Sequence, residues 1–117
     1  MPNDQITLSA GGSRVEIVPA LGGKIASLHL AGREWLWTSD LLPRVAPTEA
    51  VAADDAASYV RTADTGGYDE CLPTVGACRL PDDVPGYGGL ALPDHGELWS
   101  QHAPTERTGR ETAVTRW

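Results

Sequence analysis

The sequence predicts an all-β chain whose first forty residues form an antiparallel meander. Two observations lead to this prediction: the apolar runs are short and alternate with polar residues, and glycine-rich turns separate them. Alternation with a period of two places one side of a strand against a core and the other side against solvent. Short strands joined by tight turns favour antiparallel pairing, because parallel strands need long crossover connections.

Two strands are expected within the first eighteen residues. The apolar run 6–8 is followed by the glycine turn 10–13, and the segment 14–18 then alternates between polar and apolar side chains. Pro19 ends the second strand, because proline has no N–H to donate to a ladder.

Two more strands are expected before residue 40. A turn at 21–23 leads to a strand over 24–30, whose alternation puts apolar residues on one face and His29 on the other. After a further glycine turn, a fourth strand is expected over 34–37. The apolar face of the third strand consists of Ala26, Leu28 and Leu30.

The rest of the chain is less regular. Residues 40–65 predict a long excursion from the sheet, with one or two helical turns over 49–57 capped by Thr48, and loops of this length are often functional. The glycine-rich segment 84–89 is expected to be a loop. The last segment, 111–117, alternates as a strand does and stops in mid-pattern, so we expect the natural sequence to continue beyond it.

Composition and charge exclude several function classes. With 117 residues, the chain predicts one domain over 1–117. Its net charge of −7 would repel a phosphate backbone, so a nucleic-acid partner is not expected. It has no apolar stretch near the ~20 residues of a membrane span and no signal peptide at its start, which predicts a cytoplasmic protein without a membrane partner.

The two cysteines predict free thiols in a reducing compartment, with a local disulfide as the alternative. The spacing of Cys71 and Cys78 matches no common zinc pattern, and the chain has neither a nucleophile elbow nor a phosphate loop. We therefore expect no metal and no cofactor.

Among the three histidines, His95 has the most suggestive surroundings. Asp94 precedes it and can orient its imidazole or tune its protonation, and Gly96 follows it and permits a close backbone approach. The alternative is a turn with a solvated histidine. His29 and His102 are expected to be ordinary surface or loop residues.

Four motifs occur in an order and spacing that resemble the opening of the galactose-mutarotase-like (aldose 1-epimerase) family. The stretch from 66 to 76 is similar to the family's G-G-x-x-x-C-x-P-x-x-G pattern, and His95-Gly96 falls where the family has its H-G motif. In order, the motifs are GGKIASL at 22–28, GREWLW at 32–37, GGYDECLPTVG at 66–76 and DHG at 94–96.

The resemblance implies an antiparallel β-sandwich that binds a hexose and interconverts its anomers. In this family a carboxylate removes the proton from the C1 hydroxyl while a histidine protonates the ring oxygen, which is acid–base chemistry without a metal. The resemblance assigns His95 as catalytic residue. We expect Asp94, Trp99 and Glu70 to bind the sugar together with His95.

Two departures from the family pattern change this expectation. Family members often continue H-G-F-A-R, whereas here Trp99 stands in place of the arginine, which leaves either a stacking surface for a sugar or a core residue. The family's general-acid histidine and general-base glutamate, which lie beyond the H-G motif, have no counterpart. We therefore expect an isomerase-like chain without catalytic activity. The alternative is a non-catalytic carbohydrate-binding module or a fragment that needs a partner chain, and exposed sheet edges predict oligomerisation.

Overall fold

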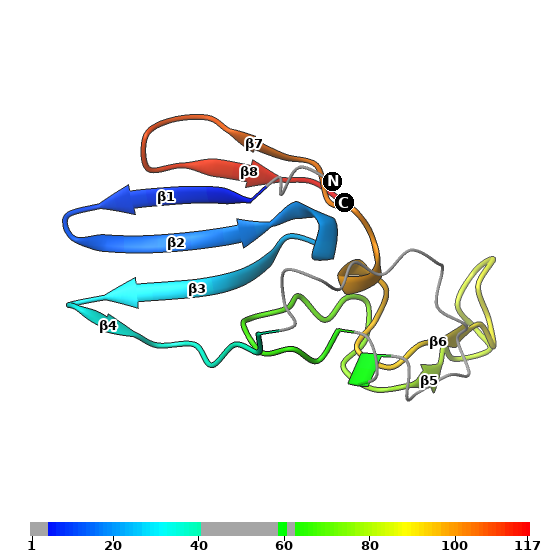
Figure 1. Cartoon of the computed structure of the whole chain (residues 1–117). Helices are drawn as coiled ribbons and strands as arrows, with labels where there is room; N and C mark the ends of the chain where they lie inside the picture. The colour runs from blue at the N-terminus through cyan, green and yellow to red at the C-terminus, as the bar shows by residue number, and fades with distance from the viewer. Residues whose placement is uncertain (1–4, 41–58, 61–62) are drawn as a thin grey trace.

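The computed structural model describes residues 5–40, 59–60 and 63–117, and an antiparallel four-stranded sheet forms its first part (Figure 1). The strands follow one another in space as they do in sequence, so the predicted meander is confirmed. Its members are β1 (Ile6–Ala10), β2 (Ser13–Val18), β3 (Lys24–Leu30) and β4 (Arg33–Glu34).

The β1–β2 hairpin owes its tight turn to two glycines. Ala10 pairs with Ser13, so only Gly11 and Gly12 lie between the strands, and both have positive φ angles, of 52° and 83°. Such a turn matches the twist of the strands it joins, and glycine adopts it without steric cost. Further along β2, the register with β3 shifts between Glu16 and Ile17, an irregularity of the kind that a β-bulge produces.

A sharp corner joins β2 to β3. Pro19–Leu21 form a single 3-10 turn (η1), and Gly22 ends it in the left-handed conformation. Leu21 is buried there and packs with Ala26 and the half-buried Val18. The corner thus supplies one of the small cores of the molecule.

The fourth strand is shorter than predicted. The expectation of a strand over 34–37 is wrong beyond Glu34. Trp35 still donates its amide to Leu28 O of β3 at 2.9 Å, but the Glu34 carboxylate accepts the amides of Leu28 and Leu36, which a continued ladder would use. Glu34 Oε1 accepts hydrogen bonds from the backbone N–H groups of Leu28, Trp35 and Leu36 at 2.9, 3.0 and 2.9 Å. The chain bends away after Trp35, and the next bridge found among the described residues pairs Thr38 with Gly66.

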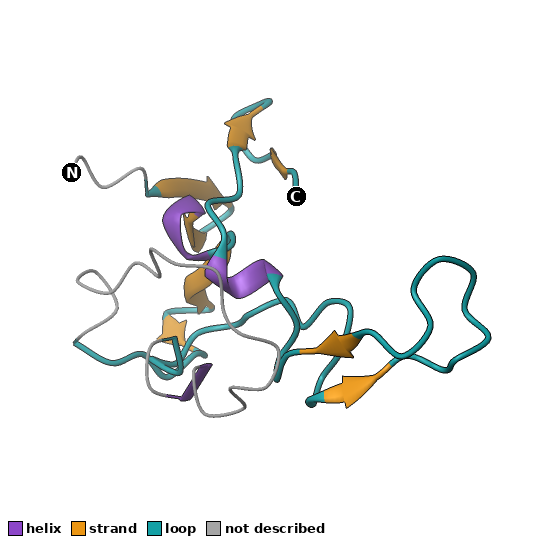
Figure 2. Cartoon of the chain, turned by 90° about the vertical axis from the view of Figure 1, so that its right-hand side faces the viewer, coloured by secondary structure: helices purple, strands orange, loops and turns teal. Residues whose placement is uncertain are grey.

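Two short hairpins complete the strands. β5 (Cys78–Arg79) pairs with β6 (Ala91–Leu92), and the loop between them, which includes the predicted loop 84–89, projects from the body of the chain (Figure 2). β7 (Thr105–Arg107) pairs with β8 (Ala113–Thr115), which occupies the centre of the predicted last strand. A 3-10 turn, η3 (Leu98–Ser100), lies between the hairpins.

The described residues thus form an antiparallel β-rich structure in which helical segments are short turns. The expected helical turns over 49–57 lie outside the described residues. No helix in the described part of the chain has the length and apolar character needed to cross a membrane.

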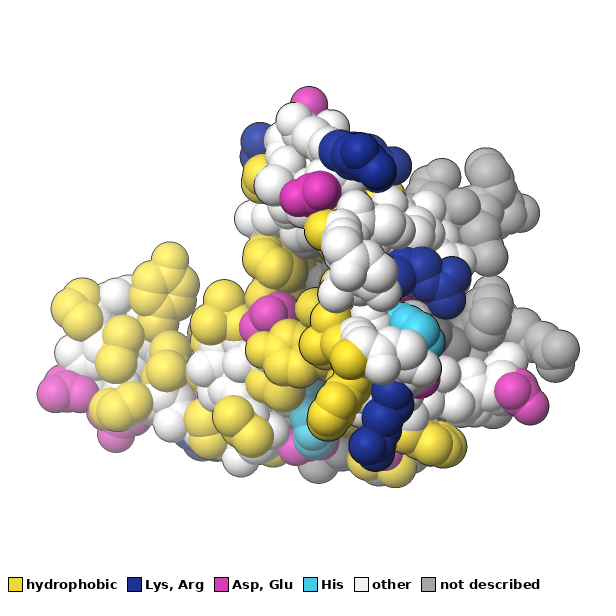
Figure 3. Space-filling view, turned by 90° about the vertical axis from the view of Figure 1, so that its left-hand side faces the viewer, with side chains coloured by type: hydrophobic (Ala, Val, Ile, Leu, Met, Phe, Trp, Pro, Cys, Tyr) yellow, Lys and Arg dark blue, Asp and Glu magenta, His cyan; other side chains and the backbone are white. Residues whose placement is uncertain are grey.

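The described core is small, and much apolar surface is exposed. Figure 3 shows hydrophobic side chains gathered on one side of the molecule. Trp37 and Val75 are 72% and 74% exposed, which is unusual for such large apolar residues. The buried apolar side chains among the described residues are Leu21, Ala26, Tyr59, Ala63, Leu92, Trp99 and Ala103, together with Pro19 and Pro93.

Candidate functional site

The loop that carries His95 is held in an uncommon backbone conformation. It leads from β6 to η3, and both His95 and Gly96 have positive φ, of 59° and 69°. The segment 72–75 fixes this conformation: the His95 amide donates to Val75 O at 3.2 Å, and the Glu97 amide donates to Leu72 O at 2.8 Å. A non-glycine residue in the left-handed region costs free energy, and such residues occur preferentially at functional sites.

Two neighbours orient the imidazole of His95. Its Nδ1 lies 2.7 Å from Asp94 Oδ2, so Nδ1–H can donate to the carboxylate and leave Nε2 as the second polar atom of the ring. One face of the ring stacks on Tyr59, with the ring centroids 3.9 Å apart and the planes 4° from parallel. The side chain remains 32% exposed, and no hydrogen bond engages Nε2 within the described part of the chain.

Tyr59 in turn is held by an aromatic and a polar contact. The ring of Trp99 meets it edge to face, with centroids 5.4 Å apart and an interplanar angle of 82°. The Tyr59 hydroxyl donates to Asp69 Oδ2 at 2.7 Å. Burial and this hydrogen bond raise the pKa of Tyr59 above its usual value, so the phenol remains a donor at neutral pH.

A buried ion pair lies beneath Tyr59. Lys24 Nζ is 2.6 Å from Asp69 Oδ2, and the two side chains are 0% and 6% exposed. The ammonium also donates to the carbonyl oxygens of Ala63 and Gly66 at 3.1 and 2.6 Å. The second carboxylate oxygen of Asp69, Oδ1, is buried and has no hydrogen-bond partner among the described residues.

Trp99, expected as a stacking surface or a core residue, is buried, with 2% of its surface exposed. Its indole N–H donates to Gly96 O at 2.9 Å, so it braces the His95 loop from within the core. Glu70 is exposed and makes no hydrogen bond with other described residues, whereas its neighbour Asp69 is buried in the ion pair. Glu70 was therefore predicted as a site residue, whereas Asp69, which lies in the ion pair, was not predicted.

Carboxylates dominate the electrostatics around this site. Burial raises the pKa of the Cys71 thiol, and the nearby charges of Asp69, Glu70 and Asp94 raise it further. Cys71 and Cys78 are free thiols, as predicted. Within the described ranges, no three metal-ligating side chains come together.

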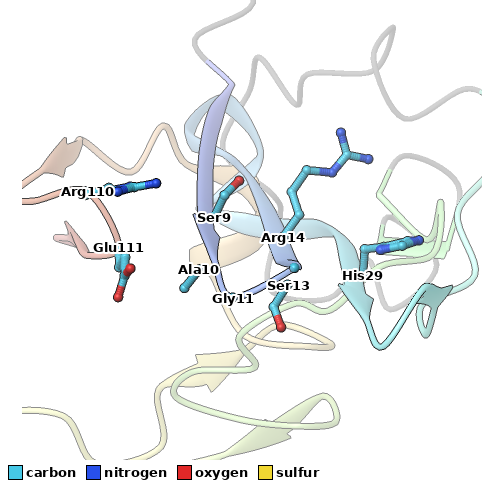
Figure 4. Close-up of a pocket in the computed structure, with 9 residues that line it drawn as sticks. Ser9, Ala10, Gly11, Ser13, Arg14, His29, Arg110 and Glu111 are labelled. Carbon is cyan, nitrogen blue, oxygen red and sulfur yellow. The ribbon is translucent and has the colours of Figure 1, made fainter.

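A separate shallow groove runs around the β1–β2 turn (Figure 4). Arg14 and His29, which pair across β2 and β3, lie on one side of the hairpin, and Arg110 and Glu111 lie on the other side. The remaining lining residues are Ser9, Ala10, Gly11, Gly12 and Ser13. None of the His95 site residues lines this groove, and its charged groups do not converge on one point.

The comparisons with known proteins add no relative to this description. No protein-family model, no curated protein and no solved structure matches the chain.

Proposed function

We propose that this chain binds a neutral hexose at the His95 loop, as part of an antiparallel β-sandwich of the aldose 1-epimerase type. The observation that carries the proposal is the state of His95: a left-handed backbone, Nδ1 committed to Asp94, one ring face committed to Tyr59, and a third of the side chain exposed. A histidine restrained in this way presents Nε2 in a defined direction, which suits a hydrogen bond to a sugar hydroxyl or ring oxygen.

The charge of the site favours an unphosphorylated sugar. Three carboxylates, of Asp69, Glu70 and Asp94, lie close enough to Cys71 to raise its pKa, and the only cation described among them, Lys24, is already paired with Asp69. A phosphate group would meet repulsion here, whereas hydroxyl groups can donate to carboxylates. The absence of the family arginine at Trp99 agrees with this preference.

Anomer interconversion needs one group to protonate the ring oxygen and another to take the proton of the C1 hydroxyl. His95 supplies one acid–base group. Asp94 and Asp69 are committed to His95 and to Lys24, and the exposed Glu70 has no described partner that would orient it. We therefore propose sugar binding without appreciable turnover for this chain.

Titration with galactose or glucose, followed by intrinsic tryptophan fluorescence, tests the proposal. We expect saturable changes in the wild-type chain and in the control variant His102→Ala, whose histidine is exposed in a separate loop. We expect His95→Ala to lose the response and hexose 6-phosphates to bind more weakly. An absence of saturation with every hexose would refute sugar binding. A polarimetric rate well above buffer, abolished by His95→Ala, would refute the lack of turnover.

A second candidate function is a non-catalytic binding module that works with a partner chain. The exposed apolar surface supports it, because Trp35, Trp37, Val75 and Tyr87 are each more than half exposed. Size-exclusion chromatography tests this candidate: we expect self-association or aggregation, and a sharp monomeric peak with cooperative melting would contradict it.

A further inference from the structure

We infer that the buried pair Lys24–Asp69 acts as a positioning device for the imidazole of His95, with the ring of Tyr59 as the intermediate. The inference rests on the proposed sugar site, since His95 is the group that the device would serve. It assigns a role to three residues that lie outside the H-G motif.

An unbroken series of short contacts connects the Lys24–Asp69 pair to the imidazole of His95. Lys24 Nζ lies 2.6 Å from Asp69 Oδ2, the same oxygen accepts the Tyr59 hydroxyl at 2.7 Å, and the Tyr59 ring stacks on His95 at 3.9 Å. The stack is nearly parallel, at 4°. Movement of the phenol along its own plane would therefore shift the surface on which the imidazole lies.

The energetics of the pair argue against a purely stabilising role. Two charges taken out of water lose much of their hydration, and apolar side chains of similar volume often serve stability equally well. Asp69 in addition keeps one oxygen buried without a partner in the described part of the chain, which carries a further cost. The pair does, however, provide one fixed acceptor for the Tyr59 hydroxyl, and so a single position for the ring.

Together with Asp94, this arrangement restrains the imidazole in two independent ways. The carboxylate of Asp94 sets the rotation of the ring by holding Nδ1, and Tyr59 sets its plane. With both restraints in place, the direction of Nε2 is defined. Preorganisation of this kind lowers the cost of ordering a side chain when a ligand binds.

The experiment follows the His95 ring protons by NMR in the full chain. A stacked phenol shifts these protons upfield through its ring current, and the exposed His102 provides an internal reference. Tyr59→Phe keeps the ring and removes only the hydroxyl. The double variant Lys24→Met/Asp69→Leu replaces the ion pair by apolar side chains and is checked for cooperative unfolding.

We expect the His95 shift in Tyr59→Phe to move toward the His102 value, and sugar affinity to fall by about 2- to 10-fold, as for the loss of one hydrogen bond. The double variant should give the same displacement, and the triple variant no more, because all of them remove one connection. Unchanged His95 shifts in Tyr59→Phe would overturn the inference, even if the double variant fails to fold. Additive displacements in the triple variant would also overturn it. Since the NMR measurement needs no sugar, a wild-type chain that binds no hexose would refute the proposed function alone.

Discussion

Replacing Gly96 by alanine tests whether the backbone around His95 is as closely packed as the structure shows. A Cβ at this position would overlap the carbonyl oxygen of Leu72 and come within 2.8 Å of the Leu72 nitrogen. These are backbone atoms, and the same carbonyl accepts the Glu97 amide, so Leu72 cannot move without breaking that bond. Gly32 provides a matched control, because its φ of 76° is also positive but an added Cβ would meet nothing within 4 Å.

The expected losses differ between the two sites. Both variants force an alanine into the left-handed region, which costs roughly 1–2 kcal/mol. Gly96→Ala adds an overpacking cost of about 1–3 kcal/mol and the weakening of the Glu97 hydrogen bond, worth about 0.5–1.5 kcal/mol. Gly32→Ala should therefore lose only the backbone contribution, and Gly96→Ala at least about 1.5 kcal/mol more.

Urea denaturation of the three chains measures these losses as shifts of the midpoint, provided the slope stays constant. We expect the order wild type, Gly32→Ala, Gly96→Ala in decreasing stability. Equal losses for the two alanine variants would show that the Leu72–Gly96 contact is not as close as described. The His95 loop would then not be held by close backbone packing.

Three further outcomes are expected. Four hydrogen bonds lower the pKa of Glu34 from 4.5 to about 2, so the folded state gains stability from this carboxylate above pH 4.5 and loses the gain as the pH falls through 2. The unfolding free energies of wild type and Glu34→Gln, measured with urea, should differ by about 1 kcal/mol at pH 7, a modest value because the group is exposed, and the difference should shrink as the pH falls toward 2. Lys24→Ala leaves a buried carboxylate uncompensated and should lower the unfolding free energy by about 3–5 kcal/mol in the same assay. The double variant Lys24→Met/Asp69→Leu should recover most of this loss. A loss below about 1 kcal/mol in Lys24→Ala would contradict the burial of the pair. Iodoacetamide should label the exposed Cys78 before Cys71, because burial and nearby carboxylates disfavour the Cys71 thiolate. Mass spectrometry of the digested chain measures the order of labelling, and faster labelling of Cys71 would contradict the prediction.

The strands were the part of the fold that local sequence could predict. Alternation and glycine turns act over a few residues, and β3 has the predicted bounds, 24–30. The fourth strand failed because the Glu34 side chain competes for amides that a strand pattern assigns to the ladder. In a strand pattern Glu34 is only a polar residue, so the pattern does not predict that its side chain competes for backbone amides.

The candidate site was only half predictable. The glycine next to His95 indicated a special backbone, and in the structure both residues have positive φ. The ion pair beneath was missed, because Lys24 and Asp69 lie 45 positions apart. One signal was present: Lys24 shares its strand face with Ala26, on the side predicted to be apolar, and a lysine there requires a buried partner.

The long reach of Lys24 has a consequence for how the molecule folds. Its three acceptors lie 39, 42 and 45 positions further along the chain, whereas the β1–β2 hairpin joins residues no more than 11 apart. Contacts between residues this far apart cost more loop-closure entropy than the local contacts of a hairpin. We therefore expect the ammonium to stay hydrated until segment 63–69 docks. The contacts around His95 should form last, so that a refolding chain forms its sheet before its candidate site.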